Sequence, residues 1–218
     1  MAAKLGFFQI YYDDDQLEYL YPFATPVKND SLTHYFENTV IASMVPFVDA
    51  ERISICSWRL ARKRGDVRRH TKGELTEESI INNDYDVAIL TPRAPSHMPL
   101  AMAAIWHRGV WDIAIKKLRE FINVPNELKR AIYENHFVAN GNLYKEYVRT
   151  CLIPCIDFME HNKDIFLLDA NYRTKKTKEE QRAYKEMTGR DDWPIAPFVL
   201  ERLFSIWIND KDLKVISL

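Results

Sequence analysis

The chain begins with an apolar run that ends in three aspartates. Residues 7–12 (FFQIYY) are aromatic and β-branched, which is typical of a buried strand. Residues 53–58 alternate apolar and small side chains, and the short apolar run at residues 86–91 is closed by Pro92. This pattern predicts three strands in the first half of the chain.

A helix is predicted between the first two strands. Ser31 or Thr33 would cap it, and the apolar residues that follow recur at helical spacing. These residues are Phe36, Val40, Met44 and Phe47. Strands that alternate with a helix in this way indicate an α/β fold with a mostly parallel sheet flanked by helices.

The second half of the chain carries mainly helical periodicity. The predicted helices cover residues 100–122, 125–135, 142–161 with a kink at Pro154, 174–189 and 196–210. We find no internal repeat and no long linker. The 218 residues therefore predict a single domain, residues 1–218, with a largely helical C-terminal half.

Composition narrows the function classes. Thirty basic residues balance thirty-one acidic ones, which disfavours a nucleic-acid binder, and the basic run at 59–70 lacks aromatics for base stacking. No apolar run is long enough to span a membrane, and the N-terminus has no signal-peptide pattern. Cys56, Cys151 and Cys155 have no zinc-like spacing and are odd in number. We expect a soluble cytoplasmic protein.

Polar residues follow each predicted strand at its carboxyl end, where open parallel sheets bind ligands. They are Asp13–Asp15 after the first strand, Arg59, Arg62, Lys63 and Arg64 after the second, and Thr91, Arg93 and His97 after the third. Cations that face a cleft suit a phosphate-bearing ligand. Asp84 and Asp86 have the spacing of an Asp-x-Asp metal motif, but they precede their strand, so we expect a turn there.

Three parts of the chain are similar to a family of enzymes. They read FENTVIASMVPF…ISICSWRLARKR, ENHFVANGNLYKEYV…PCIDFME and WPIAPFVLERLFSIWI. Together they resemble bacterial capsular and surface-polysaccharide glycosyltransferases, which have a His-centred motif before a tyrosine-rich helix and a final ERLF helix. The resemblance implies a GT-A-like, Rossmann-like fold. About residues 1–110 would bind a nucleotide sugar, and about 111–218 would form a helical acceptor side.

The resemblance implies that the chain moves a sugar from a nucleotide-sugar donor to a glycan or polysaccharide acceptor. The residues that it matches are Glu37, Asn38, Trp58, Arg59, His136, Glu201 and Arg202. Such a reaction needs cations at the leaving diphosphate and, in an inverting enzyme, a base. Candidates are Arg59, Lys63 and Arg93 for the diphosphate, Glu201 or His136 for the base, Trp58 or Trp193 for stacking, and Asp13 for the ribose or nucleobase.

Metal dependence is an open question. GT-A enzymes commonly hold Mn²⁺ or Mg²⁺ through Asp-x-Asp at the end of a central strand, whereas residues 86–91 end in Thr-Pro-Arg. Either another carboxylate substitutes, or Arg59 and Arg93 neutralise the diphosphate. The alternative function is a non-catalytic relative that binds a nucleotide, a glycan or a protein. Structural roles also stay open: a core histidine for His136 and an ion pair for Glu201.

Overall fold

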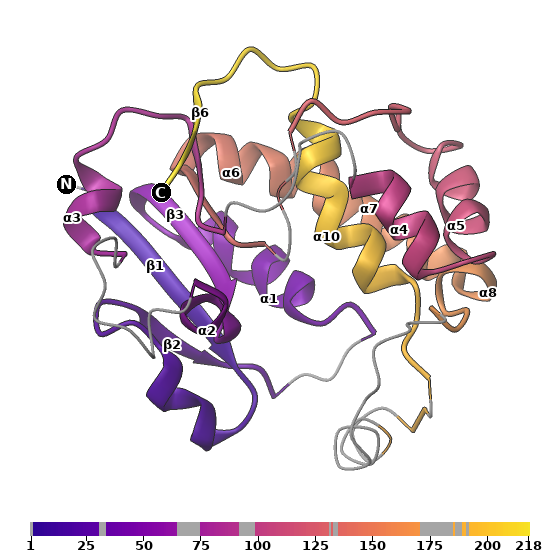
Figure 1. The fold of residues 1–218 in the computed structure, drawn as a ribbon, viewed down its shortest axis with the longest axis horizontal. Helices are drawn as coiled ribbons and strands as arrows, with labels where there is room; N and C mark the ends of the chain where they lie inside the picture. Colours follow the sequence, from indigo (N-terminus) through magenta and orange to yellow (C-terminus); the bar gives the residue numbers. More distant parts are fainter. Residues whose placement is uncertain are drawn as a thin grey trace.

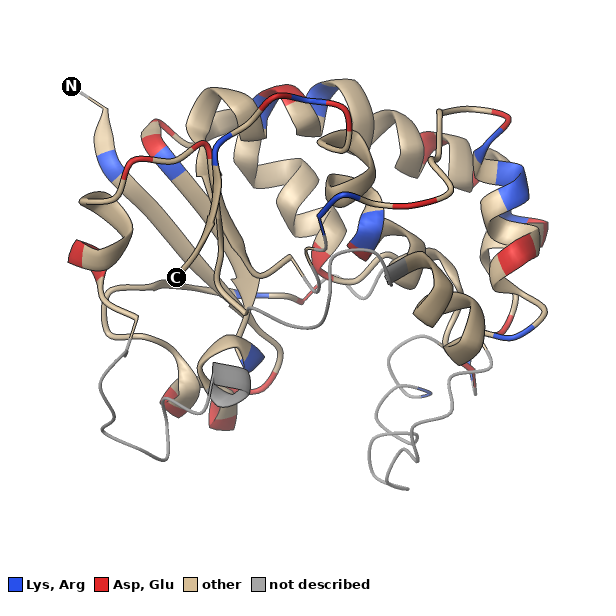
Figure 2. Ribbon diagram, turned by 45° about the horizontal axis from the view of Figure 1, so that its top comes forward, with Lys and Arg blue, Asp and Glu red and all other residues tan. Residues whose placement is uncertain are grey.

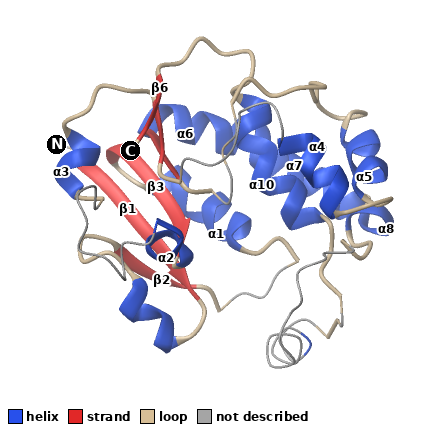
Figure 3. Ribbon diagram, viewed as in Figure 1, coloured by secondary structure: helices blue, strands red, loops and turns tan. Residues whose placement is uncertain are grey.

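One sheet forms the centre of the protein. The computed structural model describes residues 2–30, 34–64, 75–91, 99–130, 132, 135–170, 185, 189–190 and 192–218, with residues 62–64 and 99 as backbone only. The strands are β1 (Ala3–Tyr11), β2 (Thr25–Lys28), β3 (Ala50–Ser57), β4 (Val87–Ile89), β5 (Phe137–Asn140) and β6 (Val215–Ser217). Their order is β2-β1-β3-β5-β4-β6, and helices lie on both sides of the sheet (Figures 1 and 3).

The sheet is mostly parallel, as the sequence predicts. Strand β1 pairs in parallel with β2 and β3, and β4 pairs in parallel with β6. Strand β5 is antiparallel to both of its neighbours, β3 and β4. Because β5 runs the opposite way, its first residue lies at the same edge of the sheet as the carboxyl ends of the other strands.

A thin layer covers one face of the sheet. It consists of the 3-10 helix η1 (Asp14–Tyr19), α2 (Arg59–Arg64) and α3 (Glu77–Ile81). Thr76 caps α3 because its hydroxyl accepts a hydrogen bond from the Ser79 amide, and the Ser79 hydroxyl accepts one from the Thr76 amide. Phe7 of β1 and Leu60 of α2 belong to the buried cluster between these layers.

A thick helical layer covers the other face. Its elements are α1 (Glu37–Met44), η2 (Val45–Phe47), α4 (Pro99–Trp106), α5 (Trp111–Leu118), α6 (Gly141–Tyr147), the π-helix η3 (Val148–Leu152), α7 (Ile153–His161), α8 (Lys163–Phe166) and α10 (Ala196–Trp207). Phe137 of β5 stacks on Phe204 of α10, with ring centroids 4.0 Å apart. None of the described helices has the length and apolar character needed to cross a bilayer.

Two helix predictions differ from the structure. The predicted helix 100–122 is divided into α4 and α5 by a turn in which Gly109 adopts φ 80°. The described residues of 125–135 form no helix, because their amides bond elsewhere: Lys129 donates to Asn209 Oδ1 and Ile132 to Ser205 Oγ. The predicted helix 174–189 lies almost entirely outside the described residues.

The prediction for residues 142–161 is confirmed in outline. Helices α6 and α7 are joined through the π-turn η3, which ends two residues before Pro154. Pro154 has no amide hydrogen to donate to the preceding turn, and this accounts for the change from α-helix to π-helix just before it.

Candidate ligand site at the carboxyl ends of the strands

The connections that leave β1 and β2 diverge at the carboxyl end of the sheet. The chain leaves β1 across the thin layer through η1 to reach β2, and then crosses the thick layer through α1 to reach β3 on the other side of β1. The loops after β1 and β2 therefore leave toward opposite faces of the sheet, whereas the loop after β3 enters α2 in the same thin layer as η1. In α/β sheets such a topological switch point is where ligands bind.

Tyr12, Glu37 and Asn29 meet at this point. Tyr12 follows β1 directly, Asn29 follows β2, and Glu37 is the first residue of α1. The half-buried Tyr12 side chain is hydrogen-bonded to the Glu37 carboxylate and lies next to Asn29. Burial, together with the charge and hydrogen bond of Glu37, raises the pKa of Tyr12 well above its usual value. Tyr12 therefore stays protonated and donates to Glu37.

Two strained residues flank the same site. Among the described residues other than glycine, Phe36 (φ 50°) and Asn135 (φ 56°) are those with positive φ. Phe36 precedes Glu37, and Asn135 precedes His136. The buried Asn135 amide donates to Asn38 Oδ1 at 3.4 Å, and Asn38 Nδ2 donates to the Tyr35 carbonyl. Strain of this kind is concentrated at functional sites in proteins.

His136 joins two strand ends. Its Nε2 lies 3.2 Å from the hydroxyl oxygen of Ser57, the last residue of β3. Both side chains are buried, and Ser57 Oγ also accepts a hydrogen bond from the Arg59 amide. His136 thus lies at the carboxyl ends of the neighbouring strands, in a buried environment that suits the positioning of other groups more than direct contact with a ligand.

Two aromatic rings and one guanidinium group gather beyond the carboxyl end of β3. The Trp58 ring is 5.6 Å from Tyr19 of η1, and the Arg59 guanidinium is 5.5 Å from the Trp58 ring. Arg59 is exposed and close enough to Tyr12 to lower its pKa slightly against the other effects. The buried Gln9 side chain supports this group, because it donates a hydrogen bond to the Ser57 carbonyl and accepts one from the Tyr21 amide.

The three aspartates lie at the turn into η1. Asp13 precedes η1 and accepts a hydrogen bond from Gln16, while Asp14 pairs with Lys28 at 3.2 Å and raises the pKa of that lysine. All three carboxylates are exposed. Figure 2 shows the acidic residues of η1 next to the start of α2. A contact between Asp13 and a nucleoside remains a prediction.

The other predicted residues are distributed between the rim and the helical layer. Trp193 packs against Phe36, with ring centroids 4.9 Å apart, and so lies near the start of α1. Arg202 is buried in the helical layer, where it donates a hydrogen bond to the Phe198 carbonyl and lies over the Trp111 ring. Its Nη1 atom is 3.7 Å from Oε2 of the neighbouring Glu201.

The remaining predicted residues lie on parts of the chain with little or no description. Lys63 belongs to α2, but its side chain is not among the described ones. Arg93 and His97 lie outside the described residues.

Asp84 and Asp86 do not reach this rim. They lie before β4, and both bond Lys214 at the start of β6, Asp84 through the ammonium group and Asp86 through the amide. These residues therefore lead into β4, as the sequence predicts, but in an irregular segment and not in a hydrogen-bonded turn. Within the described part of the chain, no group of three or more His, Cys, Asp or Glu side chains is placed to hold a metal ion.

Several residues of the site were not among the sequence candidates, namely Tyr12, Tyr19, Asn29, Ser57 and Asn135. Tyr12 and Ser57 were assigned only to strands, although each stands at the predicted carboxyl end of one. Asn135 precedes His136, and its positive φ depends on the distant Asn38. No single-sequence signal marks Asn29.

No family model, curated protein or solved structure matches this chain.

Proposed function

We propose that this chain is a glycosyltransferase of GT-A-like fold that binds a nucleotide-activated sugar at the switch point and transfers the sugar to a glycan acceptor. The observation that carries the proposal is the group of side chains at the switch point, where Glu37 and Arg59 both lie close to Tyr12 and strained residues precede Glu37 and His136. It combines the ligand position typical of α/β sheets with groups for hydroxyls and phosphates.

Each group has a proposed role. Arg59, with Lys63 one turn further along α2, neutralises the leaving diphosphate. Trp58 and Tyr19 stack on the nucleobase, and Glu37 accepts hydrogen bonds from ribose or sugar hydroxyls in place of the bond from Tyr12. His136 holds the strand ends through Ser57, and Glu201 stays a candidate base.

One observation favours the non-catalytic alternative. The Tyr12 hydroxyl already donates a hydrogen bond to the Glu37 carboxylate. The described residues also offer no group of three or more His, Cys, Asp or Glu side chains that could hold a metal ion at a diphosphate. A protein that only binds a nucleotide or a glycan would need neither a free carboxylate nor a metal.

Thermal-shift measurements with nucleoside diphosphates and nucleotide sugars, each with and without Mn²⁺ or Mg²⁺, test binding. Ligand at about 100 times Kd stabilises the native state by about 2.7 kcal/mol. We expect Arg59→Ala and Glu37→Gln to abolish most of this stabilisation. Lys116→Ala and Asp112→Asn are matched controls, because both residues are exposed on α5.

The outcomes separate the two functions. If no nucleotide stabilises the wild-type protein, the proposal is wrong. If a nucleotide sugar binds but is neither hydrolysed nor transferred to any glycan acceptor, the non-catalytic alternative is favoured. Consumption of the donor that is lost in Arg59→Ala supports the transferase.

A further inference from the structure

One edge of the sheet is open beside the first half of β1. Strand β2 begins at Thr25, opposite Phe8, whereas β3 pairs with β1 from Ala3 onward. On the side of β2, residues 3–6 therefore have no partner strand among the described residues. Unpaired edges of this kind attract further strands unless they are protected.

A hydrogen bond at the far end of β1 fixes which backbone groups face this edge. The Ile10 carbonyl accepts a hydrogen bond at 2.8 Å from the amide of Trp58, the residue after β3, so Ile10 faces β3. Successive residues of a strand direct their amide and carbonyl groups to opposite sides, and the register with β3 is continuous from Leu5 to Ile10. Leu5 therefore directs its N–H and C=O groups toward the open edge, and Phe7 directs its N–H group there.

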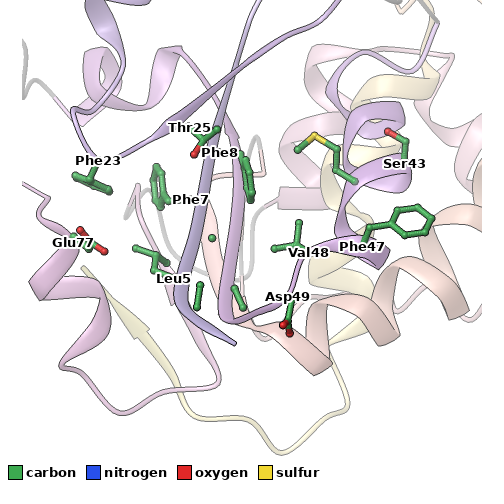
Figure 4. Close-up of a pocket in the computed structure, with 14 residues that line it drawn as sticks. Leu5, Phe7, Phe8, Phe23, Thr25, Ser43, Phe47, Val48, Asp49 and Glu77 are labelled. Carbon is green, nitrogen blue, oxygen red and sulfur yellow. The ribbon is translucent and has the colours of Figure 1, made fainter. Parts of the chain in front are cut away.

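An apolar hollow of about 580 Å³ surrounds this edge. In Figure 4, Leu5 and Phe23 line one side of β1, and Phe47 and Val48 line the other. Phe47 is 86% exposed, more than any other large apolar residue described. Exposed apolar surface beside unpaired backbone groups is typical of a site that binds an extended peptide.

The charged side chains of the hollow are acidic. Among the described residues that line it, they are Asp49 and Glu77; both are exposed, and neither carboxylate has an ion pair or a hydrogen bond with a described residue. Asp49 lies beside the beginning of β1, because its neighbour Ala50 pairs with Ala3. Glu77 lies on the other side of β1, the side of Leu5 (Figure 4). A ligand with a cation on each side of the strand would pair both carboxylates.

We propose that this edge binds an extended peptide segment of a partner protein, which adds one strand beside β1 and carries two adjacent basic residues next to two adjacent apolar ones. Adjacent residues of a strand point to opposite faces of the sheet. The two basic side chains therefore reach Asp49 and Glu77, and the two apolar side chains reach Phe47 and Phe23.

The backbone groups and the carboxylates together identify a basic peptide as the occupant. An acyl chain or another purely apolar ligand would leave the Leu5 backbone groups and both carboxylates without partners. A peptide backbone pairs with Leu5 and with the Phe7 amide, as in other proteins that add a strand at a sheet edge. The hollow adjoins the amino-terminal half of β1, whereas the switch point lies beyond its carboxyl end, so this binding does not depend on the proposed transferase activity.

Fluorescence anisotropy with two labelled peptides tests the binding. Their sequences are Ser-Arg-Arg-Phe-Val-Ser and the reverse, Ser-Val-Phe-Arg-Arg-Ser, because a sheet edge accepts a strand of either direction. We expect at least one of them to bind saturably, and its analogue with Glu in place of both Arg residues to bind at least about tenfold more weakly. N-methylation of one alternate set of amides should abolish binding and N-methylation of the other set should not, because only one set faces β1 in a paired strand.

Variants of the protein test the site. We expect Asp49→Asn and Glu77→Gln each to weaken binding about threefold, and Phe47→Ser about tenfold, because each removes an exposed contact of the hollow. Asp112→Asn, an exposed carboxylate on α5, is the matched control and should leave binding unchanged. The proposal is wrong if neither peptide binds at millimolar protein, if the double variant Asp49→Asn/Glu77→Gln binds as tightly as the wild type, or if both N-methylated sets bind equally well.

Discussion

At the scale of single residues, backbone strain distinguishes the surroundings of Glu37 and His136 from the rest of the described chain. Phe36 and Asn135 hold positive φ on two different elements, and Asn38 connects them through hydrogen bonds to Tyr35 and Asn135. Positive φ costs an ordinary residue about 1–2 kcal/mol, so the surrounding contacts must compensate for it. Glu37 and His136, the neighbours of the strained residues, are thereby fixed in direction.

Substitution of Asn135 measures this strain. Asn135→Ala loses the bond to Asn38 and keeps an unfavourable φ of 56°, so we expect a loss of about 2 kcal/mol of unfolding free energy. Asn135→Gly loses the same bond without the steric penalty and should cost about 1 kcal/mol less. Urea denaturation checks both variants. Equal losses would mean that position 135 is not strained.

Tyr12→Phe tests whether Tyr12 competes with ligands for Glu37. The variant frees the carboxylate from the tyrosine hydroxyl, so a nucleotide sugar should bind about threefold more tightly, the equivalent of one modest hydrogen bond. Glu37→Gln should bind more weakly. Calorimetric titration compares the two. If Tyr12→Phe weakens binding as much as Glu37→Gln, then Tyr12 itself contacts the ligand.

At the scale of elements, the sequence predicted the strands and helices whose apolar pattern is long enough to show a period. Strands β1, β3 and β4 and helices α1 and α10 lie where the apolar runs placed them, apart from shifts at their ends. Strands β5 and β6 have four and three residues, too few to show a period, and β2 contains Pro26. Their positions depend on contacts with segments distant in the sequence.

The same distinction applies to the site. The rule of strand ends located Arg59 from the sequence, and Trp58 came from the family resemblance. Tyr12, Ser57 and Asn135 are defined by the residues that they meet after folding, and a single sequence does not show those partners. The α1 match at Glu37 and Asn38 came from family resemblance. In the structure Glu37 lies beside Tyr12, and the buried Asn38 accepts a hydrogen bond from Asn135.

Gly141 fixes α6 against β3, and its substitution has a clear expected effect. A Cβ atom at position 141 would overlap the Ala50 carbonyl oxygen, which is backbone and does not yield easily. We expect Gly141→Ala to cost about 3 kcal/mol of stability. Gly109→Ala is the control, because it meets open space and should cost only about 1 kcal/mol through its positive φ. Thermal unfolding that shows the reverse order would contradict this assignment.

At the scale of the whole molecule, both halves of the chain contribute to one structure. Strands β5 and β6 come from the second half, and β5 separates β3 from β4. The buried cluster under the thick layer includes residues from β1 to α10. The predicted nucleotide-sugar half and helical half thus share a sheet and a core.

His107 makes the stability of this shared core depend on pH. Its Nδ1 donates to the Ala170 carbonyl at 2.7 Å, and burial, with a smaller effect of Arg202, lowers its pKa to about 4. The unfolded chain takes up a proton below about pH 6.5, but the folded one does not until about pH 4. The stabilisation is therefore complete above pH 6.5, and up to about 3 kcal/mol is lost as the pH falls to 4.

Urea unfolding at a series of pH values measures this loss. His107→Asn keeps a donor for Ala170 without a titrating ring, so its stability should change less between pH 6.5 and 4. His161→Asn is the matched control, since His161 is exposed and should leave the wild-type slope intact. A wild-type slope in His107→Asn would assign the pH dependence to other groups.

The position of β5 also has a consequence for how the protein is made. A ribosome delivers β3 and β4 long before residues 137–140 emerge, so the middle of the sheet stays vacant during most of synthesis. In that interval both flanking strands present open edges, and a partner that pairs with them prematurely would block the correct insertion. The two parts of the sheet can join only once β5 has emerged, which makes this four-residue strand the step that links them, and β6 adds to the other side of β4 last.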